Sequence, residues 1–296
     1  MHVQDKKLDF DSLIGKSALS DGVQRREFMK LALGTGFAAA VMPVMAQSVV
    51  RTDTEGLTAG TVNITVDGQE VPVYRAQPEG KKNLPVILVI QEIFGVHEHI
   101  ADVARRFAKL GYMALAPELY VRQGDPRKYD SIPELQKEVV SRVPDAQVMK
   151  DLDACVEWAG KNGGDTDRVG ITGFCWGGRI TWLYCAHNPK VKAGVAWYGR
   201  LVGQESENTP KHPVDIAPSL KVPVLGLYGG KDTGIPLDTV DKMKAALARG
   251  SSGSEFVIYE NAGHAFHADY RPSYAEADAK DGWRRCVSWF KEHGVG

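Results

Sequence analysis

The chain has few cysteines and no excess of charge of either sign. Four cysteines among 296 residues are too few for a disulfide framework, and none of them shows the Cys-x-x-Cys spacing of a zinc site. The 36 basic and 37 acidic residues leave a formal net charge of −1, so we expect no nucleic-acid partner. Hydrophobic residues make up 43% of the chain, which excludes a disordered protein and is typical of a globular one.

A long hydrophobic run is also missing. The most apolar stretch, residues 31–44, has about 14 residues, against the roughly 20 that a membrane-spanning helix needs, so we expect no stable membrane anchor. Arg25 and Arg26 precede this stretch, and Ala46 before Gln47 ends a small-residue cleavage site. That order is typical of a signal peptide.

The arginine pair, followed by Phe28 and Lys30, resembles the twin-arginine export signal. The resemblance implies a signal peptide over residues 1–46, a mature domain over residues 47–296, the twin-arginine export machinery as a partner of the precursor, and a periplasmic location. The alternative is an amphipathic N-terminal helix of a cytoplasmic protein with a chance arginine pair.

The rest of the chain has the pattern of an α/β protein. Residues 61–66 and 71–75 alternate in polarity around Asp67-Gly68, which predicts an antiparallel hairpin. Continuous apolar runs then alternate with segments of helical spacing, which predicts a mainly parallel, doubly wound sheet in one domain. The runs are residues 86–90, 113–116, 169–172, 193–197, 222–228 and 256–259; the helical segments are residues 100–110, 146–159, 179–187, 237–247 and 274–293.

Residues 117–144 interrupt this rhythm with proline, glycine and charge, including Arg122, Arg127 and Arg142. The segment follows the carboxyl end of a predicted strand, which is where open α/β sheets bind ligands. It is either part of a binding site or a plain surface insertion.

The strongest chemical signal is Gly173-Phe174-Cys175-Trp176-Gly177, between a predicted buried strand and a predicted helix. This is the pattern of a nucleophile elbow with cysteine in place of serine. Side chains at either glycine would collide with the neighbouring strand and helix. The helix N-terminus favours a thiolate at Cys175, whereas we expect the other three cysteines, Cys155, Cys185 and Cys286, to be inert apolar residues.

A cysteine nucleophile needs a base and a group that orients the base. Asp232 and His264 each follow a predicted strand, in the chain order nucleophile, acid, histidine. His267 is the competing base. A zinc site made by Asp232, His264 and His267 is a weak alternative, so we expect no metal and no organic cofactor.

Together with residues 89–96, 116–120, 230–232 and 263–266, the elbow resembles the dienelactone hydrolase family. The resemblance runs from about residue 61 to residue 293 and implies an α/β-hydrolase fold with a triad of Cys175, His264 and Asp232. It also implies that Glu92 lies beside the resting thiol and helps to deprotonate it when substrate binds. The oxyanion hole would be formed by the backbone N–H groups of Trp176 and Ile93.

Substrate recognition is less well defined. Lactone-opening members of the family hold the substrate carboxylate with arginines, one of them four residues after the histidine, where this chain has Ala268. Arg271 is a candidate replacement, and Arg122 is another. Trp197 and Tyr198 could line the pocket, as could Trp176 and Tyr270, unless they pack in the core.

Three functions fit these residues. The first is a hydrolase that opens a dienelactone-like lactone or ester through an acyl-enzyme on Cys175. The second is a general carboxylesterase or thioesterase with the same triad, and the third is a binding protein that has lost turnover. A neutral aryl ester tested beside a dienelactone separates the first two, and an unreactive Cys175 thiol favours the third.

The export signal gives a direct prediction. We expect the protein isolated from the periplasm of its native host to lack residues 1–46, because the cleavage site follows Ala46. Intact-mass spectrometry checks this, and periplasmic protein that retains Met1 or His2 would contradict it.

Overall fold

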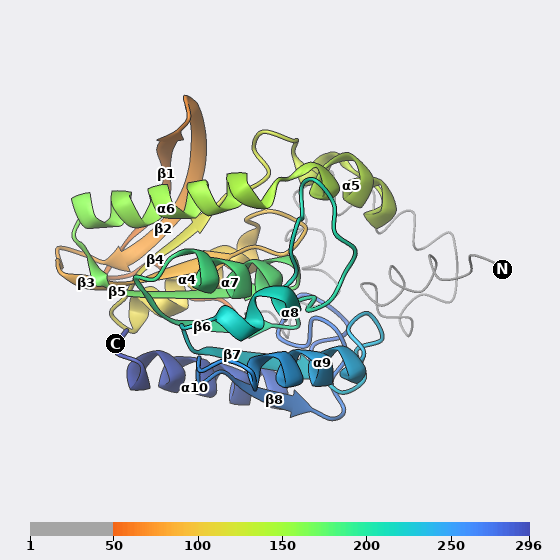
Figure 1. The fold of residues 1–296 in the computed structure, drawn as a ribbon. Coiled ribbons are helices and arrows are strands. Elements are labelled where there is room, and N and C mark those ends of the chain that lie inside the picture. The colour runs from red at the N-terminus through yellow and green to blue at the C-terminus, as the bar shows by residue number, and fades with distance from the viewer. Residues whose placement is uncertain (1–49) are drawn as a thin grey trace.

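The computed structural model describes residues 50–296, so the predicted export signal lies outside the described residues. Within residues 50–296, no helix is both long enough and apolar enough to cross a membrane. The described part of the chain forms one eight-stranded sheet with helices packed around it (Figure 1).

The sheet is parallel except at its N-terminal edge. Its strand order is β1-β2-β4-β3-β5-β6-β7-β8, and Figure 1 shows this order from β1 at the top to β8 at the bottom. The predicted α/β-hydrolase fold, with its antiparallel start and mainly parallel sheet, is confirmed. The strands are β1 (Leu57–Val66), β2 (Gln69–Pro78), β3 (Leu84–Ile90), β4 (Met113–Pro117), β5 (Gly164–Phe174), β6 (Val191–Trp197), β7 (Val224–Gly229) and β8 (Glu255–Tyr259).

The predicted hairpin turns where the sequence indicates. Asp67 and Gly68 both have positive φ angles, +50° and +79°, which are the backbone angles of the tight hairpin turn that Asp-Gly favours. The two strands pair over their whole length, from Leu57 opposite Pro78 to Val66 opposite Gln69. The strands are longer than predicted, because the polarity alternation weakens before residue 61 while the pairing continues.

The helices cover both faces of the sheet. On one face, α4 meets α10, with the Phe107 ring 4.7 Å from that of Trp283; on the other, Tyr184 of α7 donates a hydrogen bond of 2.9 Å to Asp153 of α6. The helices are α4 (Glu98–Lys109), α5 (Ile132–Glu138), α6 (Asp145–Lys161), α7 (Trp176–His187), α8 (Pro213–Ile216), α9 (Leu237–Leu247) and α10 (Glu276–Glu292), with 3-10 turns η1 (Pro126–Lys128), η2 (Val140–Arg142) and η3 (Ala217–Ser219).

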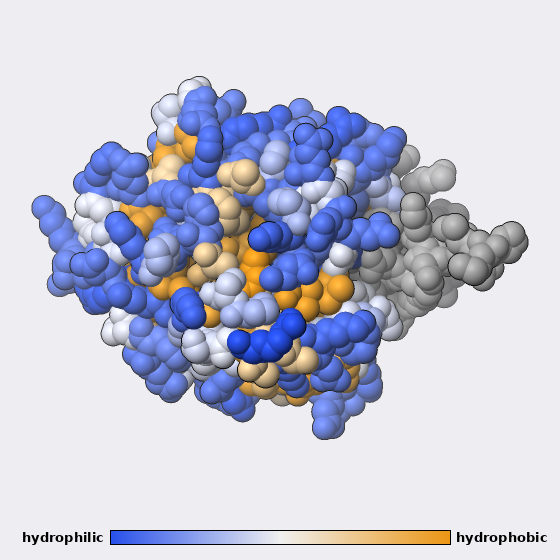
Figure 2. All heavy atoms as spheres, in the orientation of Figure 1, coloured by the Kyte–Doolittle hydropathy of each residue, from blue (hydrophilic) through white to orange (hydrophobic). Residues whose placement is uncertain are grey.

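Most helices present polar residues to the solvent, whereas nine of the twelve residues of α7 are buried. Hydrophilic side chains cover most of the face in Figure 2, and apolar ones show between the helices near the middle of the view. The strands between the helix layers are buried: β4 has five buried residues in a row. Burial on both faces explains why these strands are continuous apolar runs in the sequence.

The strand register brings five loops to one edge of the sheet. Ile90 of β3 pairs with Gly173 of β5, and Phe174 pairs with Trp197 of β6. Trp197 pairs in turn with Leu227 of β7, and Gly229 pairs with Tyr259 of β8. Because these strands end level with one another, the residues that follow them are neighbours at the carboxyl edge, which is where α/β sheets place their sites.

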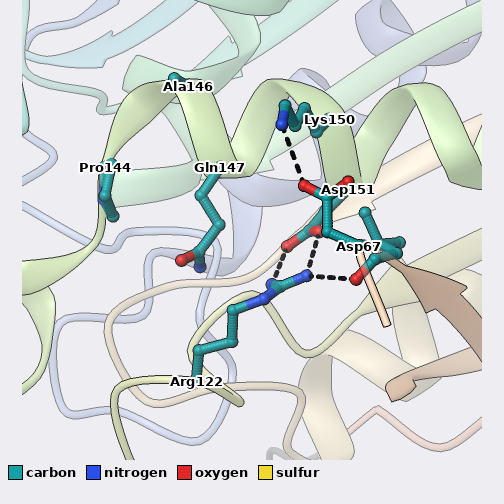
Figure 3. Close-up of a pocket in the computed structure, with 8 residues that line it drawn as sticks. Asp67, Arg122, Pro144, Ala146, Gln147, Lys150 and Asp151 are labelled. Carbon is teal, nitrogen blue, oxygen red and sulfur yellow. Dashed lines mark hydrogen bonds and ion pairs between the residues drawn. The ribbon is translucent and has the colours of Figure 1, made fainter. Parts of the chain in front are cut away.

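The segment 117–144 contains η1, α5 and η2, and its Arg122 is held in an ion pair. Both terminal nitrogens of Arg122 donate to the buried carboxylate of Asp151 on α6, at 2.8 and 2.9 Å. Lys150 of α6 pairs with Asp67 in the hairpin turn at 2.9 Å. Figure 3 shows both pairs in a shallow pocket between the hairpin turn and α6. The Arg122 charge is therefore engaged in joining the insertion to α6.

We expect Arg122→Ala to lower the free energy of unfolding by about 2–3 kcal/mol, because it leaves the buried Asp151 carboxylate without its partner. Urea unfolding measures this effect, and kcat/KM for an aryl ester should change little. The matched control is Arg127→Ala, which removes an arginine that pairs with Asp125 in a more exposed position and should cost less than about 1 kcal/mol. A large loss of activity with unchanged stability would instead support the predicted substrate role of Arg122.

Candidate functional site

Cys175 lies between β5 and α7 in a strained backbone conformation. Its φ angle is +55°, which is uncommon for a residue with a side chain. Two sets of hydrogen bonds hold it there. Its N–H donates to the carbonyl of Trp197 at 3.0 Å, and its own carbonyl accepts from Gly178 at 3.0 Å and Arg179 at 3.3 Å. Its side chain is partly exposed, so the thiol is accessible at the edge of the sheet.

The two glycines of the elbow permit a close backbone approach. A Cβ atom at Gly173 would lie 2.2 Å from the carbonyl oxygen of Gly177, and one at Gly177 would lie 2.5 Å from the carbonyl oxygens of Ile90 and Gln91. Both distances are far below van der Waals contact. The predicted steric reason for these glycines is therefore confirmed, and α7 starts directly against the end of β3.

His264 is oriented by Asp232, as the chain order predicts. Nδ1 of His264 lies 2.7 Å from Oδ2 of Asp232, and both side chains are buried. The other carboxylate oxygen of Asp232 accepts from the backbone N–H groups of Gly234 at 2.9 Å and Ile235 at 3.1 Å. These bonds fix the carboxylate, which in turn fixes the plane of the imidazole ring.

The remaining ring nitrogen of His264, Nε2, is not used by Asp232. Nε2 makes no conventional hydrogen bond among the described residues, yet the Cys175 side chain is close enough to influence the histidine. Burial disfavours the charged imidazolium, but the negative charges of Asp232 and Cys175 outweigh burial and raise the pKa of His264 to about 10. The imidazolium form of His264 is therefore favoured at neutral pH.

Glu92 is a buried carboxylate at the end of β3. The hydroxyl of Tyr270 donates to its Oε2, and Nε2 of His97 lies 3.4 Å from the same oxygen. Burial acts to raise the pKa of Glu92, but the hydrogen bond with His97 and the positive charge of Arg271 lower it to about 2. Glu92 is thus ionised at neutral pH although it has almost no contact with solvent.

Arg271 and Tyr198 share this neighbourhood. The Arg271 guanidinium lies 4.9 Å from the centre of the Phe94 ring and 5.8 Å from that of Tyr270, and its charge acts on Glu92. Tyr198 has a positive φ angle of +39°, and its ring lies 5.2 Å from that of His264. Its buried hydroxyl has no hydrogen-bond partner among residues 50–296, so it can bond to a ligand.

Three residues that the sequence offered as candidates for the site have other contacts in the structure. Trp197 is fully buried and donates a hydrogen bond of 3.1 Å to Thr172, so it packs in the core. The ring of His267 stacks on that of Phe174 at 5.1 Å and lies tilted against that of Trp197 at 4.5 Å, and burial lowers its pKa well below the usual value. Arg122 is engaged with Asp151. The other three cysteines, Cys155, Cys185 and Cys286, are buried as expected, and burial raises the pKa of each thiol.

The structure also adds residues that the motifs did not indicate. His97 and His99 come from the start of α4, and Asp269 comes from the loop after His264; Nδ1 of His99 lies 2.9 Å from Oδ1 of Asp269. The ring of Tyr120 packs 5.0 Å from that of Trp176, the residue after Cys175. The available signal was a run of polar residues directly after predicted strands, but nothing in the spacing pairs residues 99 and 269.

Within residues 50–296, no group of three or more histidine, cysteine or acidic side chains is arranged to hold a metal ion. Asp232 and His264 are close because they bond to each other. His267 lies instead among aromatic rings, with His99 as its histidine neighbour at 5.4 Å. The zinc alternative therefore has no support in this arrangement.

Comparison with known proteins gives the family. Residues 71–294 match the model described as "Dienelactone hydrolase family". The chain belongs to the dienelactone hydrolase family. It is 58% identical to a "Putative carboxymethylenebutenolidase" of Methylorubrum extorquens over 97% of this chain and 99% of that protein. The crystal structure of a "Putative Dienelactone Hydrolase" from Klebsiella pneumoniae covers 80% of this chain and 99% of its own, with 59% identity and a TM-score of 0.79.

A more distant relative has a more specific name. It is a "Probable 2-oxo-3-(5-oxofuran-2-ylidene)propanoate lactonase" of a Bradyrhizobium species, 30% identical over 82% of this chain and 98% of that protein. Family members thus carry names of enzymes that act on lactones, and this chain is a hydrolase of ester or lactone bonds.

The charge on His264 can be tested directly. We expect Asp232→Asn to lower the pKa of His264 by at least about one unit, because it removes the largest influence that favours the imidazolium. NMR titration of histidine-labelled protein, with His264 assigned from His264→Gln, measures this pKa. The control is Asp153→Asn, which removes the carboxylate 2.7 Å from His187 and should leave His264 unchanged. An unaltered His264 titration in Asp232→Asn would contradict the interpretation.

Proposed function

We propose that this protein hydrolyses a lactone or ester that carries a carboxylate, with Cys175 as nucleophile, His264 as base and Asp232 as the group that orients the base. The observation that supports this most is the position of an accessible cysteine at a strained elbow, beside a buried histidine fixed by an aspartate. Such an arrangement matches the geometry of acyl-transfer enzymes that use a covalent intermediate.

In the first step, the Cys175 thiolate attacks the carbonyl carbon of the substrate. The ring C–O bond of the lactone then breaks, the ring oxygen takes the proton held by His264, and the acyl group remains on Cys175 as a thioester. In the second step, water gives a proton to His264 and attacks the thioester. The carboxylic acid leaves, and Cys175 and His264 return to the paired state.

Backbone N–H groups stabilise the charge that develops on the carbonyl oxygen. The amide of Trp176 is the first in α7 and therefore has no acceptor inside the helix. Ile93 lies in the turn after β3, which the bridge between Glu92 and Gly95 closes. We assign the oxyanion hole to these two amides, which fits the approach of α7 to the end of β3.

Glu92 and Arg271 prepare the site for its substrate. Glu92 supplies a buried negative charge near Cys175 and helps to remove the thiol proton when substrate binds. Arg271 binds the substrate carboxylate in place of the arginine that the family has at position 268, where this chain has Ala268. The name of the Bradyrhizobium relative refers to a propanoate, which is an anionic lactone substrate, and this supports a carboxylate-binding role in the family.

The decisive experiment compares a dienelactone with p-nitrophenyl acetate. We expect Cys175→Ala to lower kcat for both substrates by at least about 1,000-fold, because the covalent step is lost. We expect Arg271→Gln to lower kcat/KM for the dienelactone by about 100-fold, because a charged hydrogen-bonded pair is lost, while the neutral ester changes less than about threefold.

Arg127→Gln is the matched control for Arg271→Gln, since its guanidinium pairs with Asp125 in η1. Activity that survives in Cys175→Ala would refute the covalent mechanism. A wild-type preference for the neutral ester would indicate a general carboxylesterase, and a thiol that neither turns over substrate nor reacts with iodoacetamide would indicate a binding protein.

A further inference from the structure

Two short segments, far apart in the sequence, are joined twice beside the candidate site. The first is residues 97–99, where α4 begins, and the second is residues 269–271, in the loop after His264. His99 and Asp269 form one connection, with 2.9 Å between Nδ1 and Oδ1. Glu92 forms the other, because its Oε2 accepts from Tyr270 and lies 3.4 Å from Nε2 of His97.

The two connections differ in their surroundings. Asp269 makes further hydrogen bonds through its other carboxylate oxygen. Its Oδ2 accepts from Arg106 of α4 at 3.1 Å and from the backbone N–H of Val50 at 2.9 Å. Glu92 lies toward Cys175: a Cβ atom at Gly177, two residues after Cys175, would be 2.5 Å from the carbonyl oxygen of Gln91, the residue before Glu92. One connection thus anchors the loop to α4, and the other holds a carboxylate near the thiol.

We propose that Tyr270 and His97 are positioning residues that hold the Glu92 carboxylate through its Oε2 oxygen, and that the His99–Asp269 pair fixes the two segments that carry them. This inference rests on the proposed function, since it concerns the carboxylate that assists Cys175. It adds residues that none of the sequence motifs assigns a role.

The arrangement of the two rings explains how Tyr270 and His97 hold the carboxylate of Glu92. The Tyr270 and His97 rings meet edge to face with centres 4.8 Å apart, so their polar atoms converge on one side of the carboxylate. Tyr270 directly follows Asp269, and His97 is two residues before His99. The His99–Asp269 pair is buried, so a movement that draws the two segments apart would break it.

The contacts with Tyr270 and His97 also keep Glu92 charged. The groups that face Glu92 are Tyr270, His97, His99, Arg271 and Tyr198. Burial alone would favour the neutral acid. If one donor is removed while burial stays the same, the pKa of Glu92 must rise, and the site loses negative charge as the pH falls toward that pKa.

The effect on stability follows by linkage. The pKa of Glu92 is about 2 in the folded protein, below the usual glutamate value of about 4.5, so ionised Glu92 stabilises the fold above pH 4.5, and this contribution is lost as the pH falls toward 2. A variant with a higher Glu92 pKa has a smaller contribution. The loss of stability of this variant relative to wild type is therefore largest near pH 7 and becomes smaller in acid.

The test uses Tyr270→Phe in the full chain, with thermal unfolding measured from pH 2 to pH 8 and no substrate present. We expect the difference in midpoint between variant and wild type to be largest at pH 7 and to shrink as the pH falls. With p-nitrophenyl acetate, the acid limb of the kcat/KM profile should move up by at least about one pH unit. The same change made in Glu92→Gln protein should produce neither effect.

Tyr184→Phe is the matched control, because Tyr184 is also fully buried and its hydroxyl also donates to a carboxylate, that of Asp153 at 2.9 Å. It should lower stability without moving the acid limb. The proposal would be overturned if Tyr270→Phe lowered the unfolding midpoint equally at every pH and left the acid limb of the kcat/KM profile unmoved. The thermal result does not depend on turnover, so activity that survives in Cys175→Ala would refute the role of Cys175 separately.

Discussion

The close approach of α7 to the ends of β3 and β5 is the constraint on which the candidate site depends. It is possible only because Gly173 and Gly177 carry no side chains: a Cβ at either position would lie within 2.5 Å of a backbone carbonyl. This approach places Cys175 at the N-cap of α7, where the backbone of this residue has a positive φ angle. The strain at Cys175 is held by the surrounding sheet, since its N–H bonds to Trp197 on the next strand.

A second constraint follows from the first. Because the site lies between strand ends, its charged side chains are kept away from water and need partners within the protein. Glu92, Asp232 and His264 are all buried. Each is compensated by a specific partner: Asp232 by two backbone N–H groups and an imidazole, Glu92 by a hydroxyl, an imidazole and a nearby guanidinium. Buried charges are tolerated only when they are paired in this way. The polar partners around Glu92, Asp232 and His264 are therefore a requirement of the position of these side chains.

The sequence was sufficient for the elements and for the positions of three candidate residues, because both depend on local patterns. Doubly buried strands appear as continuous apolar runs, and Cys175, Asp232 and His264 each occupy a turn directly after such a run. The sequence was not sufficient for Arg122, whose charge looks available until Asp151 is placed 2.8 Å away. Nor could it assign Trp197, since a tryptophan at a strand end can face either the core or a ligand, and only packing decides.

The residues around Glu92 show most clearly why such contacts escape sequence reasoning. His99 and Asp269 are 170 positions apart, and no motif relates them, because the requirement they meet is created by the fold: a carboxylate buried at the end of β3 needs donors from whichever loops lie nearby. Those loops are the start of α4 and the segment after His264. The loop that carries His264 therefore also carries Tyr270, which donates a hydrogen bond to the buried carboxylate of Glu92.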